Sequence, residues 1–176
     1  MRRANVRGVQ GIKRFLLVIA LALGLLAASA LPAIADEHVA KRSNWSHDGT
    51  KVHTTTAVNQ HNQYGDLQGI LKFRQRSAPN TGNFVIQIDY VRLYRALPDR
   101  SDLLVVGDTT DKNLLVTGTW AYVNSGWQRC GPNLPIGRYY AVSRFQIIHN
   151  HNVGTYVSSG WRVVRTAKWH YDGRCL

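Results

Sequence analysis

Residues 83–97 read NFVIQIDYVRLYRAL, and this stretch decides the fold class that the sequence predicts. Phe84, Ile86 and Ile88 alternate with Val, Gln and Asp, which is the period-two pattern of a β-strand with one buried face. After Tyr90 the apolar positions shift by one residue, and such a phase change indicates a β-bulge or a bend in the strand. We therefore expect a long, bulged strand in this part of the chain.

The segments on both sides of this stretch have a similar character. Short runs rich in Val, Ile, Thr, Tyr and Trp are separated by clusters of Gly, Asn, Asp and Pro, as in chains of many short strands. The pairs of runs on either side of residues 107–111 and of residues 150–153 are expected to form β-hairpins. Strands are expected at residues 51–58, 69–76, 83–97, 103–106, 114–123, 138–149, 154–165 and 169–171.

A set of about seven to nine short strands needs a second sheet to bury its apolar faces. The predicted fold class is therefore all-β: an antiparallel two-sheet β-sandwich of the jelly-roll or immunoglobulin-like type, preceded by a signal-peptide helix. A β-barrel is the alternative architecture, because closing one sheet on itself also buries one face.

The first 35 residues have the pattern of a secretory signal peptide. Five Lys or Arg and no acidic residue precede an unbroken apolar run over residues 15–30. Ala33 and Ala35 supply the small side chains that a signal peptidase requires, so cleavage is expected just before Asp36. A cut after Ala30 is the second choice, and an uncleaved anchor is the alternative because the uncharged stretch is long enough to span a membrane.

This signal resembles those of small exported proteins of Gram-positive bacteria, in its long basic start and its A-I-A site. The resemblance covers the signal alone. It implies a secreted chain that is extracellular or associated with the cell wall. After cleavage, residues 36–50 are expected to form a polar N-terminal lead-in, and residues 51–176 a single β domain.

The charge of the mature chain favours anionic partners. Without the signal, 17 Lys and Arg face ten Asp and Glu, so the net charge falls from +12 to about +7. Such a chain is attracted to polyanions such as cell-wall or surface polymers. The basic residues form no long run, so no specific nucleic-acid contact is expected. We expect a monomer with no membrane contact once the signal is removed.

The chain has two cysteines, Cys130 and Cys175. Export to an oxidising compartment makes a disulfide between them the expected state, which would fasten the C-terminal end. Two free thiols and an intermolecular bridge are the alternatives.

Candidate binding residues come from two patterns. Lys72, Arg74 and Arg76 alternate along one expected strand and so share one face of it, either as a binding stripe or as an ordinary solvated or charged edge. Residues 122–127 (YVNSGW) and 156–161 (YVSSGW) echo each other. We expect two similar strand kinks in which Ser-Gly bends the chain and turns Trp127 and Trp161 inward, with a pair of equivalent aromatic binding sites as the alternative.

His149 and His151 are weak candidates for a metal site, because two imidazoles two residues apart need a third ligand and no spacing supplies one. We expect neither a bound metal nor a cofactor. The predicted function is a non-enzymatic extracellular module that binds anionic surface polymers or a protein partner. The alternative is a secreted hydrolase with a His/Asp site near the hairpin tips, for which no catalytic motif is present.

Overall fold

The structure is a computed structural model that describes residues 35–61, 63–77, 83–152 and 155–175. The signal-peptide helix and the cleavage residue Ala33 lie outside these residues. From Ala35 onward the chain forms one compact unit.

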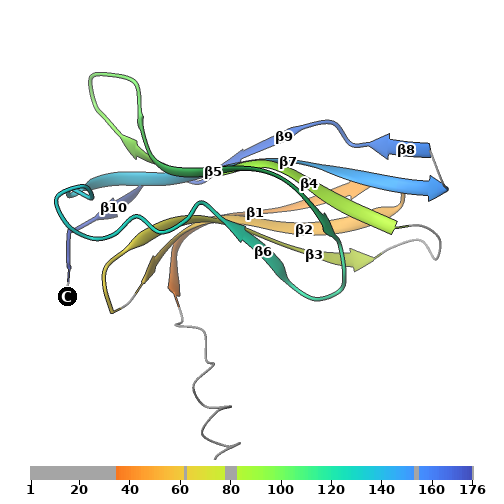
Figure 1. Ribbon diagram of the computed structural model, residues 1–176, viewed down its shortest axis with the longest axis horizontal. Helices are drawn as coiled ribbons and strands as arrows, with labels where there is room; N and C mark the ends of the chain where they lie inside the picture. Colours follow the sequence, from red (N-terminus) through yellow and green to blue (C-terminus); the bar gives the residue numbers. More distant parts are fainter. Residues whose placement is uncertain (1–34, 62, 78–82, 153–154, 176) are drawn as a thin grey trace, which may run out of the picture. The chain divides into compact units, whose positions relative to one another are not determined.

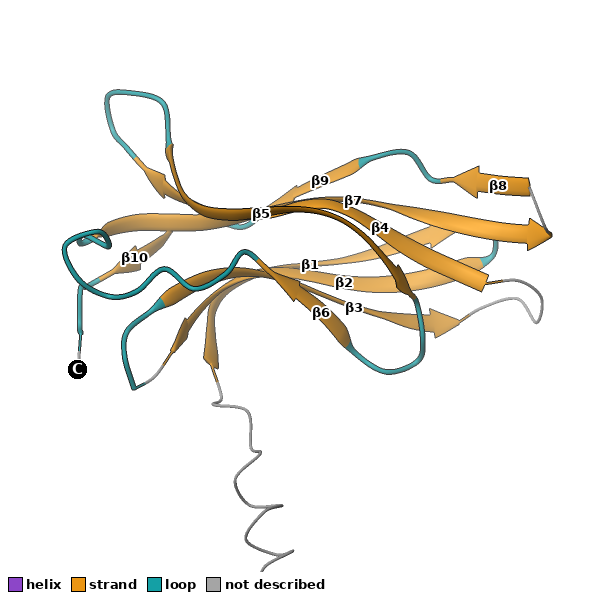
Figure 2. Ribbon diagram, in the orientation of Figure 1, coloured by secondary structure: helices purple, strands orange, loops and turns teal. Residues whose placement is uncertain are grey.

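The described residues form ten β-strands and no helix (Figure 2). No segment in that part of the chain is therefore a helix of the length and apolarity needed to cross a membrane. The strands are β1 Ala35–His47, β2 Thr50–His61, β3 Leu67–Ser77, β4 Asn83–Ala96, β5 Leu103–Leu115, β6 Ala121–Asn124, β7 Gly137–Asn152, β8 Thr155–Ser158, β9 Arg162–Arg165 and β10 Trp169–Tyr171.

The strands form two antiparallel sheets, which lie one above the other in Figure 1. The first sheet has the order β1-β2-β3-β6. The second has the order β10-β7-β4-β5, with β8 and β9 also paired to β7. The prediction of an all-β, antiparallel, two-sheet chain is thus confirmed.

The stretch that decided the prediction is β4, which lies between β5 and β7. Its inward side chains, Phe84, Ile86 and Ile88, pack against Leu71 and Phe73 of β3 in one hydrophobic core. The register of β4 with both neighbours shifts between residues 88 and 90, so the predicted bulge is confirmed.

Residues 36–50, predicted as a polar lead-in, contain all of β1 except Ala35, and β1 pairs with β2 from end to end apart from a register shift at His38. Together with the splitting of the strand at 154–165 into β8 and β9, this raises the number of strands in the described residues from the seven to nine expected to ten. β1 escapes sequence analysis because an edge strand with one solvent-facing side needs few apolar residues.

The first expected hairpin, with its turn at residues 107–111, was a wrong prediction. Residues 103–115 form the single strand β5 beside β4, and β6 belongs to the other sheet. Gly107 marks a close approach rather than a turn, because a Cβ at this position would lie 2.7 Å from Cγ of Arg92. The second expected hairpin is present, since β8 and β9 pair with β7.

The predicted disulfide joins Cys130 to Cys175, with Cα atoms 5.6 Å apart. The preceding strand, β10, pairs with the start of β7. The hydroxyl of Tyr171, a fully buried side chain, donates a hydrogen bond to the carbonyl of Gly65 at 3.0 Å. The C-terminal segment is therefore fastened by covalent, sheet and side-chain contacts.

Candidate functional site

The outer surface of the first sheet carries the basic stripe predicted from the sequence. Lys72, Arg74 and Arg76 point away from the core, because the alternating residues Leu71 and Phe73 are completely buried. Cross-strand neighbours on β1 and β2 widen the stripe into a surface that we call the basic face. Its cationic or titratable members are Arg42, Lys51, His53, Lys72, Arg74 and Arg76.

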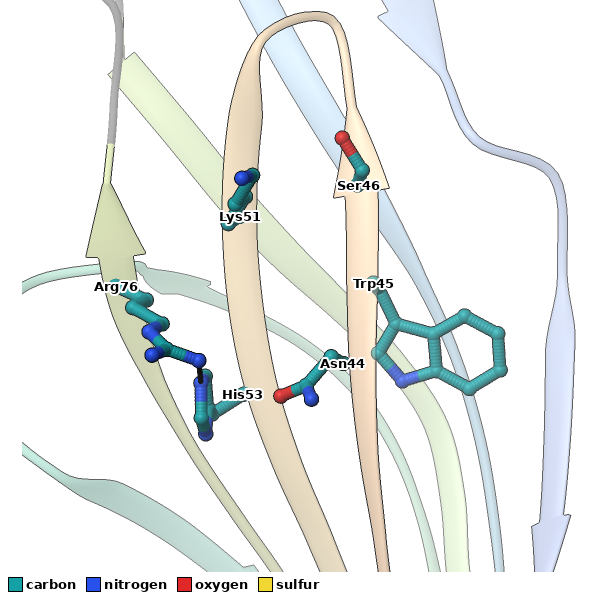
Figure 3. A pocket seen from close by; sticks show the side chains of 6 residues that line it. All are labelled: Asn44, Trp45, Ser46, Lys51, His53 and Arg76. Atoms are coloured by element: carbon teal, nitrogen blue, oxygen red, sulfur yellow. Dashed lines mark hydrogen bonds between the residues drawn. The ribbon is translucent and has the colours of Figure 1, made fainter.

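Aromatic and polar groups lie among these charges. The guanidinium carbon of Arg74 lies 4.7 Å from the ring centre of Trp120, an arrangement that exposes a flat ring beside a cation. Nη1 of Arg76 lies 3.2 Å from Nε2 of His53. Figure 3 shows these two side chains facing each other, with Asn44 directed toward them from β1. They border an open pocket of about 270 Å³.

The charge balance of the basic face is positive. Glu37 contacts Lys72 and lies 3.9 Å from a guanidinium nitrogen of Arg42, which offsets part of this charge. Loss of solvent around the ring of His53, followed by the nearby charges of Arg76 and Arg74, holds the pKa of His53 below its ordinary value. A polyanion bound here would relieve that repulsion.

The first sequence echo, residues 122–127, forms an irregular edge beside β3, which we call the first edge motif. Ser125 exchanges two hydrogen bonds with Gly69: its N–H donates to the carbonyl, and its hydroxyl accepts from the N–H, both at 2.9 Å. Gly126 follows with φ at 82°, a left-handed conformation that favours glycine.

The second echo, residues 156–161, forms the same structure beside β7, and we call it the second edge motif. Ser159 exchanges the corresponding bonds with Ile147, at 2.8 and 2.9 Å. Gly160 has φ at 71°. The expectation of two similar kinks at Ser-Gly is therefore confirmed.

The direction of the tryptophans differs from the expectation. Trp127 and Trp161 lie on the outer surfaces and are 39% and 40% exposed, rather than turned inward. The strand pairing gives the physical reason. From Asn124 to Gln128, and from Ser158 to Arg162, the edge segment has one residue more than the strand beside it. An inserted residue reverses the alternation of the side chains that follow it. The ring centre of Trp127 lies 5.6 Å from that of His61, and the ring centre of Trp161 lies 4.9 Å from the guanidinium carbon of Arg144.

Sequence reasoning missed the outer surface of the second sheet. The guanidinium carbon of Arg92 lies 4.0 Å from the ring centre of Tyr90. The guanidinium carbon of Arg165 lies 3.7 Å from the ring centre of Tyr140. Tyr94 stacks on Tyr140 with ring centres 5.3 Å apart. The alternation of Tyr, Arg and Tyr in β4 was the available signal, since it places these three side chains on one face.

The histidine candidates do not form a metal site in the described residues. His149 is 2% exposed, stacks on Phe84 and hydrogen-bonds through Nδ1 to Asp48 in the β1–β2 turn. The side chain of His151 lies outside the described part of the chain. Among the described side chains, no three His, Cys, Asp or Glu residues gather closely enough to hold a metal. The buried ring of His149 thus links β7 to the β1–β2 turn.

In comparisons with known proteins, no family model, curated protein or solved structure matches this chain.

Proposed function

We propose that this chain is a non-enzymatic extracellular binding module that attaches to anionic surface polymers through its basic face. The face has the chemistry that such a ligand needs. Cations project from three adjacent strands, and Trp120 adds an aromatic ring within the same surface. Rigid strands fix the spacing of these groups, so binding requires little ordering of the protein.

One observation supports the proposal most directly. The three cations of the basic stripe lie on one side of one sheet, and Trp120 and His53 lie beside them on the same side. A solvated sheet face of average composition mixes both charge signs. Here Glu37 contacts two of the cations, and the pocket beside Arg76 remains lined by cationic and neutral polar groups together with Trp45.

We extend the proposal to the location of the chain, which is outside the cell, and to its fold type, which is a β-sandwich. An exported chain meets wall polymers outside the cell, where the Cys130–Cys175 bridge is stable. The two sheets and their shared core support a β-sandwich. The first three strands follow one another in one sheet, whereas an immunoglobulin-like domain sends its third strand to the opposite sheet.

Retention on an anionic matrix tests the proposal. We expect the domain of residues 36–176 to bind immobilised poly(glycerol phosphate) and to elute with rising salt, because screening weakens contacts between exposed charges. The triple variant Lys72→Gln, Arg74→Gln and Arg76→Gln should elute at clearly lower salt than the unmodified domain.

A charge-matched control separates the basic face from net charge. The exposed residues Arg100, Arg138 and Lys168 lie away from this face, and their replacement by Gln removes the same three charges. This control should elute close to the unmodified domain. Equal shifts for the two triple variants would show that net charge alone governs retention, and the proposed face would then be wrong.

A further inference from the structure

A second candidate site lies at the end of the first sheet, around Trp127. The rings of Tyr64 and Trp127 flank His61, with centres 4.7 and 5.6 Å from the imidazole. Both flanking rings are substantially exposed, at 56% for Tyr64 and 39% for Trp127. Tyr64 also lines an open pocket of about 440 Å³ together with Asp66, Arg129 and the two cysteines, and Trp127 is not among its lining residues. We call the side chains of His61, Tyr64 and Trp127 the Trp127 cluster.

Two amide side chains beside this cluster have unmet hydrogen-bonding capacity. Asn59 and Gln68 are direct cross-strand partners, and both face the outer surface of the sheet. They are 3% and 5% exposed, and Oδ1 of Asn59 and Oε1 of Gln68 are buried without a hydrogen-bond partner among the described residues. By strand alternation, Asn59 shares its face with His61. By the pairing of Gln128 with Leu67, Trp127 lies next to Gln68.

The second edge motif provides an internal comparison. In register, Gln146 and Gln87 occupy the positions that correspond to Gln68 and Asn59. There the polar groups satisfy one another: Nε2 of Gln146 donates to Oε1 of Gln87, and the hydroxyl of Ser158 donates to Oε1 of Gln146, both at 2.5 Å. Among the described residues, the same local structure thus has a satisfied amide network at Trp161 and two buried acceptors without a donor at Trp127.

This difference points to a ligand at the first motif. A buried amide oxygen without a donor is unfavourable, so a group that supplies donors is stabilised there. Flat aromatic rings with adjacent hydrogen-bond acceptors complement a ligand that has an apolar face and several hydroxyl groups. From this juxtaposition we propose that the Trp127 cluster binds a neutral sugar unit, stacked on Trp127, whose hydroxyls donate to Gln68 and Asn59.

The site goes beyond the basic face and is tested separately from it. The probes are three neutral tetrasaccharides: β-1,4-linked glucose, β-1,4-linked N-acetylglucosamine and α-1,4-linked glucose. Binding to isotope-labelled protein is followed through the indole N–H signals, with the Trp127 signal assigned by its loss in Trp127→Phe. We expect one probe to shift this signal saturably with a Kd on the order of 1 mM, unchanged in high salt.

Matched variants of the two edge motifs test whether the sugar binds at Trp127. Because Trp127→Ala lacks the reporting indole, the variants are compared through the backbone amide signals that the sugar shifts in the same labelled protein. Trp127→Ala should weaken binding at least tenfold, which is about 1.4 kcal/mol, whereas Trp161→Ala should change it less than twofold. Gln68→Met should also weaken binding, and its unfolding midpoint should stay equal or rise, because an unpaired buried oxygen has been removed. The triple variant of the basic face should bind the sugar normally, so failure of one proposal leaves the other intact.

Three results would overturn the inference. One is the absence of any shift for all three probes at about 10 mM, well above a millimolar Kd. Another is an equal effect of Trp127→Ala and Trp161→Ala. The last is an unaltered affinity in Gln68→Met, which would mean that the sugar does not contact the amide oxygen of Gln68.

Discussion

His53 is the residue on the basic face whose charge can change near neutral pH. Its ring loses solvent and lies near Arg76 and Arg74, and these effects together keep its pKa below the ordinary value. The free domain therefore holds His53 mainly neutral at pH 7. An anion bound to the two arginines favours the protonated ring, so the pKa of His53 rises in the complex.

This linkage predicts that polyanion binding tightens as the pH is lowered. Binding takes up a proton at His53, so the affinity should increase from pH 7 toward pH 5, by less than tenfold per pH unit because one proton is linked. The measurement is the Kd for soluble poly(glycerol phosphate) at constant ionic strength. His53→Gln should flatten the profile, whereas His170→Gln, an exposed control, should keep it. An unchanged slope in His53→Gln would contradict the linkage.

At the scale of elements, the two edge motifs show how one short sequence ends a regular strand. The serine bonds to both backbone groups of one residue on the neighbouring strand, through its own N–H and its hydroxyl. The following glycine then turns the chain in a left-handed conformation. The environments differ, because Ser125 is 3% exposed and Ser159 is only partly buried. Water can replace a lost hydrogen bond more readily at the second position.

The matched pair Ser125→Ala and Ser159→Ala tests this view. Ser125→Ala leaves the N–H of Gly69 unsatisfied in a buried place, and we expect a loss of about 2 kcal/mol in the free energy of unfolding. Ser159→Ala leaves the N–H of Ile147 nearer to solvent, and we expect a loss of about 0.5 kcal/mol. Urea unfolding measures both. Equal losses would show that burial does not distinguish the two motifs.

At the scale of the whole molecule, the C-terminal segment is held by contacts far apart in the sequence. β10 pairs with β7, and the ring of Tyr171 meets Tyr139 edge to face, with centres 5.8 Å apart. Gly65 has φ at 72° and lies against the backbone of Arg174, so a side chain at this position would collide with the C-terminal segment. The disulfide joins two cysteines that are 45 residues apart in the sequence, and it adds a covalent link to these contacts.

Removal of the bridge should therefore lower stability substantially. For a loop of this length, chain entropy predicts a loss of about 4 kcal/mol in the double variant Cys130→Ala and Cys175→Ala. Thermal unfolding of the unmodified domain with and without reductant gives the same comparison. The cysteine-free variant should not respond to reductant. A loss below about 1 kcal/mol would indicate that the β10 and Tyr171 contacts hold the segment without the bridge.

Features that depend on local periodicity could be predicted from the sequence. Alternation in residues 83–97 predicted a strand, its break at Tyr90 predicted the bulge, and the spacing of Lys72, Arg74 and Arg76 placed them on one face. The disulfide followed because the chain has two cysteines, which allow one intramolecular pairing, and because the expected export favours oxidation. The signal, the export and the anionic partner stay predictions.

The neighbours of each strand became known from the three-dimensional structure alone. It joined residues 103–115 into β5, brought Trp120 and His53 to the basic stripe, and turned Trp127 outward beside Gln68. A period of two specifies which side chains share a face, but not which strand lies beside it or where a bulge reverses the alternation. Those outcomes depend on pairing between residues distant in the chain, and both proposed binding sites arise from them.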